Sequence, residues 1–176
     1  MTLTTIRREH LMIQLIADDT KQFMNCLLRT DAFDQFLLYD MTLDVLHRFE
    51  FSGEINASYL SSDEQALYEG QRYINWLSLK PQITAILTQS HTPSNMKITM
   101  SLSKTATLDI QQRLLGESTT YPVQGFLINL TFDGKRVIVT TGVNYSQFIL
   151  DKSIEKAFDR MIEKFFKKHE VLMVTG

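Results

Sequence analysis

The sequence predicts an α+β protein, in which helices cover a mainly antiparallel sheet. A strand pair joined at Asp133-Gly134, the long amphipathic helix after it, and interspersed strand-like and helix-like segments elsewhere predict this class. Hairpins pair strands antiparallel, whereas a parallel sheet needs long crossover connections. With 176 residues, of which 44% are hydrophobic, the chain has enough material for one core. We therefore expect residues 1–176 to form a single globular domain.

Apolar residues alternate with polar ones on both sides of Asp133-Gly134. An Asp-Gly pair is typical of a two-residue type I′ turn, in which both residues have positive φ. Such a turn pairs Phe132 with Lys135 and places the alternating apolar side chains on one face. The set on that face is Phe126, Ile128, Leu130, Phe132, Val137 and Val139.

The segment after the hairpin has helical periodicity from Asp151, the expected N-cap, to Lys168. Burial of each large apolar side chain contributes roughly 1.5 kcal/mol or more, so this stripe predicts a helix packed on the sheet. The stripe consists of Ile154, Ala157, Phe158, Met161, Ile162, Phe165 and Phe166.

Before the hairpin, residues 10–17 alternate as a first strand, and Asp18 or Asp19 can cap a helix that ends near Thr30. Residues 33–51 keep a period of two, which predicts one long strand or two strands joined at a bend. In that period Leu37, Tyr39, Met41 and Leu43 share one face with His47, which we expect at the edge of the core. Residues 54–72 are polar and weakly patterned, and Ser62-Asp63-Glu64 can begin a short helix.

Tyr73, Trp76 and Leu77 recur at helical spacing and predict an aromatic cluster on a helix. A core role for the tryptophan is the commoner outcome, but this is the aromatic group that most suits a ligand. We therefore name Tyr73, Trp76 and Lys80 as candidate ligand-binding residues. Pro81 suits the first turn of a further helix, with Ile83, Ile86 and Leu87 directed inward.

Three further segments complete the expected elements. Residues 96–102 alternate as a half-buried strand, and residues 108–115 form a short helix stopped by Gly116. The apolar tail, residues 171–174, either packs against the core or pairs as an edge strand.

Composition and charge limit the partners and the cellular compartment that we expect for the protein. The net charge is -2, so there is no global attraction to nucleic acid or to acidic membranes. The single cysteine, Cys26, cannot form an internal disulfide and suits a reducing compartment. The N-terminal segment is too broken for a signal peptide, and no run reaches the ~20 apolar residues of a membrane span. We expect a soluble cytoplasmic protein without a membrane partner.

Familiar catalytic motifs do not occur in the sequence. There is no phosphate-binding glycine loop, no Gly-x-Ser-x-Gly elbow and no zinc-binding spacing. The acidic run from Asp31 to Asp44 lacks the central glycine and the closing glutamate of a calcium loop. We predict no catalytic residue, no metal ligand and no cofactor, while the question of enzyme activity stays open.

The C-terminal helix also carries a cation at every fourth position. An acid stands three residues after each of the first three, which predicts local neutralisation by about 0.2–0.5 kcal/mol per pair. We therefore predict no measurable binding of duplex DNA at physiological salt. The cations are Lys152, Lys156, Arg160, Lys164 and Lys168, and the acids are Glu155, Asp159 and Glu163.

One set of short motifs resembles a family of Gram-positive bacterial proteins of unknown function, over residues 11–168. The resemblance implies a common fold and transfers no catalytic residue. The motifs are Tyr73-x-x-Trp76, Lys80-Pro81, Thr92-Pro93, Thr140-Thr141-Gly142 and Leu150-Asp151-Lys152-Ser153.

The order of elements up to about residue 102 also resembles the repeated unit of sliding-clamp domains. The chain departs from that unit by its long C-terminal helix. Its first helix carries only Lys21 and Arg29, too few cations for a helix that lines DNA.

These observations favour a non-catalytic binding or interaction module with an unknown protein or small-molecule ligand, and assembly into a homo-oligomer is compatible with them. The first alternative is a clamp-like, nucleic-acid-associated protein, against which the charge pattern argues. The second is an enzyme that acts on small molecules without a recognisable motif.

Overall fold

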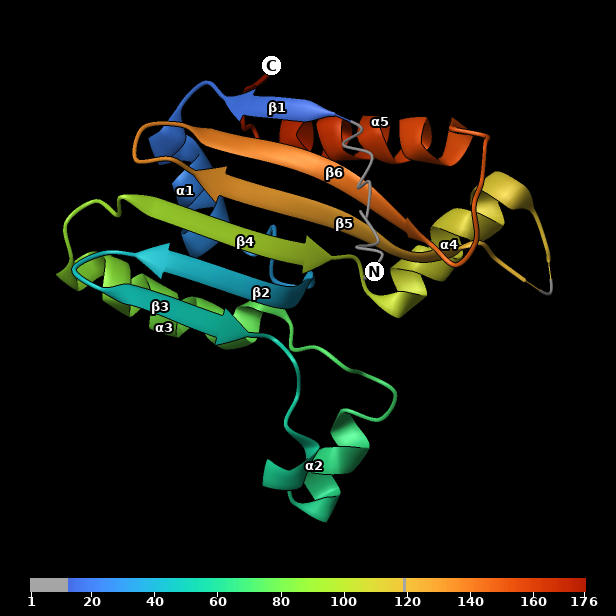
Figure 1. Ribbon diagram of the computed structural model, residues 1–176, viewed down its shortest axis with the longest axis horizontal. Helices are drawn as coiled ribbons and strands as arrows, with labels where there is room; N and C mark the ends of the chain where they lie inside the picture. Colours follow the sequence, from blue (N-terminus) through green and yellow to red (C-terminus); the bar gives the residue numbers. More distant parts are fainter. Residues whose placement is uncertain (1–12, 119) are drawn as a thin grey trace, which may run out of the picture.

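The computed structural model in Figure 1 describes residues 13–118 and 120–176 and confirms the α+β class. One seven-stranded sheet runs in the order β3-β2-β4-β5-β6-β1-β7, and every neighbouring pair is antiparallel. Its strands are β1 (Gln14–Ala17), β2 (Leu37–Asp44), β3 (Arg48–Ser52), β4 (Asn95–Ser101), β5 (Val123–Phe132), β6 (Val137–Tyr145) and β7 (Met173–Thr175). The helical segments are α1 (Thr20–Arg29), η1 (Ala57–Tyr59), α2 (Ser62–Leu67), α3 (Trp76–Gln89), α4 (Lys104–Leu115) and α5 (Ser153–Lys168).

Helices α1, α3 and α5 lie on one face of the sheet (Figure 1), and the core fills the space between them and the strands. The apolar stripe predicted for α5 is confirmed, with Ile154, Phe158, Ile162 and Phe166 all buried. Phe166 lies 5.7 Å from Phe23 of α1, measured between ring centres, so aromatic contacts join the two helices.

The hairpin of β5 and β6 forms, but its predicted register is wrong by two residues. Phe132 pairs with Val137 rather than with Lys135, so the turn has four residues. Gly134 has a φ of 92°, whereas Asp133 does not have positive φ, which excludes a type I′ turn. Instead, the Asp133 carboxylate accepts hydrogen bonds from the backbone N–H groups of Lys135 and Arg136. A shift of two keeps every side chain on its face, so the predicted core residues are still buried.

The region predicted as extended from residue 33 folds into the hairpin of β2 and β3, and its first part is a turn. A bulge between Leu38 and Asp40 shifts the register, so Leu38 rather than Tyr39 joins the core. Gly53 is required beside the bulge, because a Cβ atom there would lie 1.7 Å from the Leu38 carbonyl oxygen. The expectation for His47 is also wrong, since this residue lies in the turn between β2 and β3 and is exposed.

Helix α3 begins at Trp76, so Pro81 lies inside the helix rather than in its first turn. A proline there removes one helical hydrogen bond and disfavours the helix. Contacts distant in the sequence compensate at the N-terminus, because the N–H groups of Trp76 and Leu77 donate to the carbonyls of Phe36 and Asp34.

Of the remaining ends, the start of α5 differs from the prediction: its N-cap is Lys152 rather than Asp151, although the Asp151 carboxylate accepts from the Ser153 N–H at 2.9 Å. Asp19 caps α1, and α4 ends at Gly116, which has a φ of 74°. Helix α4 begins earlier than predicted, after the cap residue Ser103. The C-terminal tail both packs and pairs, because Val171 is buried and β7 joins β1. Of the first predicted strand, residues 10–12 lie outside the described residues.

Candidate functional site

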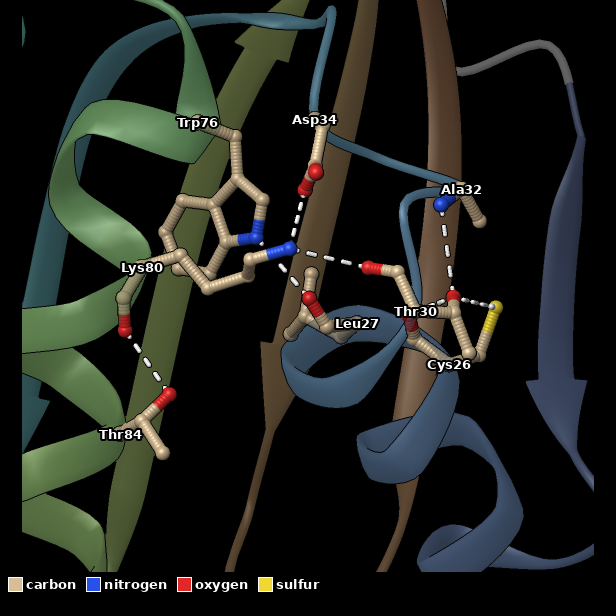
Figure 2. Close-up of polar contacts among 8 residues, drawn as sticks. All are labelled: Cys26, Leu27, Thr30, Ala32, Asp34, Trp76, Lys80 and Thr84. Atoms are coloured by element: carbon tan, nitrogen blue, oxygen red, sulfur yellow. Dashed lines mark hydrogen bonds and ion pairs between the residues drawn. The ribbon is translucent and has the colours of Figure 1, made fainter.

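Trp76, one of the three candidate ligand-binding residues, lies in the core. Its side chain is completely buried at the start of α3, and its indole N–H donates to the carbonyl of Leu27 at 2.9 Å. Figure 2 shows the indole ring directed toward α1. The residue therefore joins two helices and satisfies a carbonyl near the end of α1.

Lys80, one turn later on α3, is also held by internal partners (Figure 2). Its ammonium group forms an ion pair with the Asp34 carboxylate and donates to the Thr30 carbonyl at 3.0 Å. The two paired side chains are only 14% and 12% exposed. Removal of one partner would leave a poorly solvated charge, which makes this pair a fixed part of the structure.

Tyr73 lies apart from the other two, so the predicted aromatic cluster does not form. It precedes α3 in an isolated bridge with Glu54, whereas Leu77 is 48% exposed. The ring of Tyr73 stacks on Tyr39 at 4.2 Å between ring centres, and the Arg72 guanidinium lies 5.4 Å from the Tyr73 centre. Ligand binding at Tyr73, Trp76 and Lys80 stays a prediction, and the structure does not bring the three together.

A small lobe, residues 54–73, projects from the end of β3 (Figure 1). An ion pair between Arg72 and Glu54 at 3.0 Å closes its base. Ser61 and Glu64 form a capping box at the start of α2, and the bonds from Ser61 hold the pKa of the Glu64 carboxyl below its usual value. The lobe is therefore ordered by local polar contacts rather than by a core of its own.

The lobe contains a hollow of about 330 Å³ and two exposed apolar side chains. Tyr59 is 86% exposed and Leu67 is 80% exposed. The sequence did not predict this surface, because single apolar residues in a polar segment form no pattern. It indicated only a short helix near Ser62-Asp63-Glu64, and the observed cap residue is Ser61. The hollow is lined by Ile55, Ala57, Leu60, Gln65, Tyr68, Gln71 and Arg72.

A second candidate surface is the outer face of α5, where the expected neutralisation of the cations is wrong. None of the ion pairs among the described residues involves this helix. Glu155 is buried, and Asp159 accepts a hydrogen bond from the Thr141 hydroxyl at 2.6 Å. Only Glu163 of the three acids is exposed. The exposed cations are Lys152, Lys156, Arg160, Lys164, Lys167 and Lys168.

Buried polar groups lie behind this face, where β6 meets α5. Burial raises the pKa of the Asp159 carboxyl, and the charge of Glu163 adds to the shift. Burial also raises the pKa of the Tyr145 hydroxyl to about 12, together with the charges of Glu155 and Asp151. The Tyr145 hydroxyl is buried, and none of the residues that the structure describes forms a hydrogen bond with it.

The other chemically active groups have structural surroundings. Cys26 is buried, and burial raises the pKa of its thiol, which disfavours the reactive thiolate. Within residues 13–118 and 120–176, no group of three or more His, Cys, Asp or Glu side chains is arranged to hold a metal ion. No helix in the same part of the chain is both long and apolar enough to cross a membrane.

Together these features define an α+β protein with a one-sided helical cover and a projecting lobe. The chain belongs to a family of unknown function, DUF5721, whose sequence profile matches residues 26–173. No curated protein and no solved structure matches the chain. These comparisons give no support to a likeness with sliding clamps.

Proposed function

We propose that this protein is a non-catalytic interaction module whose lobe contacts a partner protein. The observation that carries the proposal is the exposure of Tyr59 and Leu67 on the lobe, outside the sheet and its helices. Each of them directly precedes, in the sequence, a residue that lines the hollow, Leu60 or Tyr68. Large apolar and aromatic side chains gathered near a hollow are typical of the centre of a protein interface. A side chain of the partner would enter the hollow, and the two exposed residues would contact its surroundings.

The charge of the lobe indicates the chemistry of the partner. Four carboxylates stand against the single cation Arg72, which already pairs with Glu54. A partner with an apolar centre and a basic rim would be complementary, and its association would slow as salt is added. The carboxylates are those of Glu54, Asp63, Glu64 and Glu69.

Photo-crosslinking tests the proposal. A photoreactive amino acid is placed at position 59 or 67, and at Thr105 on α4 as an exposed control. We expect one distinct partner protein at the first two positions and not at the third. Excess unlabelled wild-type chain should abolish that product, whereas unlabelled Leu67→Ser should compete poorly.

Two results would contradict the proposal. Equal labelling at all three positions would show that the lobe is not a preferred surface. A metabolite that strongly raises the melting temperature of both the wild type and Leu67→Ser would favour a small-molecule enzyme instead.

The cationic face of α5 favours one second candidate, a nucleic-acid-associated protein. It has six exposed cations, and the three for which the sequence predicted an acid partner, Lys152, Lys156 and Arg160, form no ion pair with it. An anisotropy titration with duplex DNA at physiological salt separates the candidates. The interaction module predicts no saturable binding, whereas tight binding that Arg160→Glu and added salt both weaken would favour the second candidate.

A further inference from the structure

Among the described residues, strand β3 lies at one edge of the sheet and pairs only with β2. The direction of its backbone groups follows from the bonds at its two ends. Gly53 N–H donates to the Tyr39 carbonyl at 2.9 Å, and Val45 N–H donates to the His47 carbonyl at 3.2 Å. Because these directions alternate along an antiparallel strand, odd-numbered residues of β3 bond to β2. The N–H and C=O groups of the even-numbered residues therefore point away from the sheet.

We infer that this edge pairs with β3 of a second copy of the chain, antiparallel and centred on Phe49. In this register the outward-pointing groups of Arg48 meet those of Glu50 in the second copy, and the reverse pair follows by symmetry. The two pairs would share about four backbone hydrogen bonds. Each pair also places opposite charges side by side on one face of the joined sheet.

The charges select this register among those that the backbone permits. A register centred on Glu50 would also let the outward groups bond, but it would place Glu50 against Glu50 of the second copy. Like charges directly opposite each other destabilise a strand pair. Charged residues at a bare edge also discourage pairing with uncharged strands, so the edge is specific for a complementary one.

The other face of β3 presents aromatic rings that fit the same register. Phe49 and Phe51 are only half-buried at the edge of the core, and His47 beside them is exposed. The ring centres of His47 and Phe49 are 4.4 Å apart, and those of Phe49 and Phe51 are 6.0 Å apart. Pairing centred on Phe49 sets Phe49 against its own copy and Phe51 against His47, which buries apolar area left exposed in one chain.

Helix α3, which lies behind β3 in Figure 1, presents no charge at its exposed positions. In a two-fold dimer, groups near the axis meet their own copies, so a charge there would repel itself. Small and neutral residues at this place avoid that repulsion. The exposed positions of α3 are Leu77, Ser78, Pro81, Gln82, Ala85, Thr88 and Gln89.

Sedimentation analysis of the full chain with two charge variants tests the inference. We expect the wild type to dimerise with a dissociation constant on the order of 10 μM, as a small interface allows. Arg48→Glu and Glu50→Arg should each be monomeric, because each places like charges against each other. An equimolar mixture of the two should form a heterodimer, in which both cross-strand pairs again join opposite charges.

Comparison of Glu50→Pro with Glu50→Gln, which lacks the same charge but keeps the backbone N–H, separates strand pairing from charge; we expect Glu50→Gln to retain weak dimerisation. Glu50→Pro removes one outward N–H group, which the fold of a single chain does not use, so the variant should fold but not dimerise. Thermal melting of each variant checks its fold. The double variant Arg48→Glu/Glu50→Arg should regain dimerisation relative to the single variants, although it loses the ion pair between Arg48 and Asp44 within the chain, 2.7 Å long.

Two results would overturn the inference. One is a wild-type chain that remains monomeric up to about 1 mM. The other is dimerisation of a folded Glu50→Pro chain at the wild-type concentration, which would place the interface elsewhere.

Discussion

The two edges of the sheet differ in what they offer to another strand. Strand β3 has five residues, carries alternating charges, and lies beside a helix whose exposed positions are neutral. Strand β7 has three residues without charge, and the chain that enters it leaves α5, whose outer face is cationic. A short edge beside repelling charges resists pairing, whereas β3 is complementary to itself. The comparison teaches that a few residues at an edge decide whether a sheet ends or continues.

The largest expected loss of stability comes from a change in β5, the strand midway between the two edges. Leu130 lies on the core face of β5, which is the middle strand, and is 1% exposed. Leu130→Asp buries an unpaired charge, so we expect a loss of at least about 4 kcal/mol and a largely unfolded chain. Chemical denaturation followed by circular dichroism measures this loss.

The matched control is Thr131→Asp, one residue along on the opposite, half-exposed face. This variant should keep most of the wild-type stability. If the two variants melted alike, the assignment of faces in β5 would be wrong.

The next largest loss of stability is expected from a change at the start of α3, the helix next to β3. Trp76→Phe removes the indole N–H and leaves the Leu27 carbonyl without its donor. Together with the smaller ring, this should cost about 1–3 kcal/mol. Leu77→Ala, an exposed change on the same helical turn, should cost much less; equal losses would mean that the indole does not anchor α3.

An effect of similar size is expected at the turn between β5 and β6. Gly134 has positive φ, and a Cβ atom there would lie 3.2 Å from the Ser94 carbonyl oxygen. Gly134→Val should therefore cost about 1–3 kcal/mol through backbone strain. Lys135→Val, at the next position of the turn, is the control, because it also introduces an exposed valine. If Gly134→Val is as stable as Lys135→Val, backbone strain at position 134 is not the cause of the loss.

The smallest expected change in stability concerns Asp159 on α5 and depends on pH. Because burial raises the pKa of Asp159, the folded chain holds this proton more tightly than the unfolded chain. That contribution to stability is fully present below the ordinary carboxyl pKa of about 3.9 and is lost as the pH rises through the higher folded value. Asp159→Asn keeps an acceptor for Thr141 and cannot ionise.

We therefore expect Asp159→Asn to melt slightly above the wild type at pH 7, with no difference near pH 3. Thermal melts across this range measure the difference. A variant that is less stable than the wild type at pH 7 would show that the charged carboxylate, rather than its neutral form, stabilises the contact with Thr141.

Elements with strong local patterns could be predicted from the sequence. The stripe of α5, the core face of β5, and the Gly116 stop of α4 follow from spacing alone. The bulge at Tyr39 could not be predicted, because Leu37, Leu38 and Tyr39 are all apolar and hide the reversal of parity that one extra residue causes. Likewise, Pro81 argued against the observed α3, whose start depends on the carbonyls of Phe36 and Asp34, 40 and 43 positions from their donors Trp76 and Leu77.

The candidate surfaces also could not be predicted from local sequence patterns, because they depend on contacts between residues distant in the sequence. Trp76 and Lys80 carry chemistry that a ligand could use, but partners distant in the sequence engage both of them. The lobe surface and the β3 edge depend on exposure and on neighbouring elements, neither of which a sequence pattern reports. The cationic row on α5 also has a different environment from the predicted one, because two of its three acids, Glu155 and Asp159, are directed toward the sheet.

The most direct test of the difference between the two edges is amide hydrogen exchange measured by NMR at low and high protein concentration. The N–H of Glu50 on β3 and the N–H of Thr175 on β7 both point away from the sheet, as the bonds around them indicate. We predict that exchange at Glu50 slows as the concentration rises, while exchange at Thr175 does not change. Concentration-independent exchange at Glu50, or equal slowing at both residues, would contradict the account.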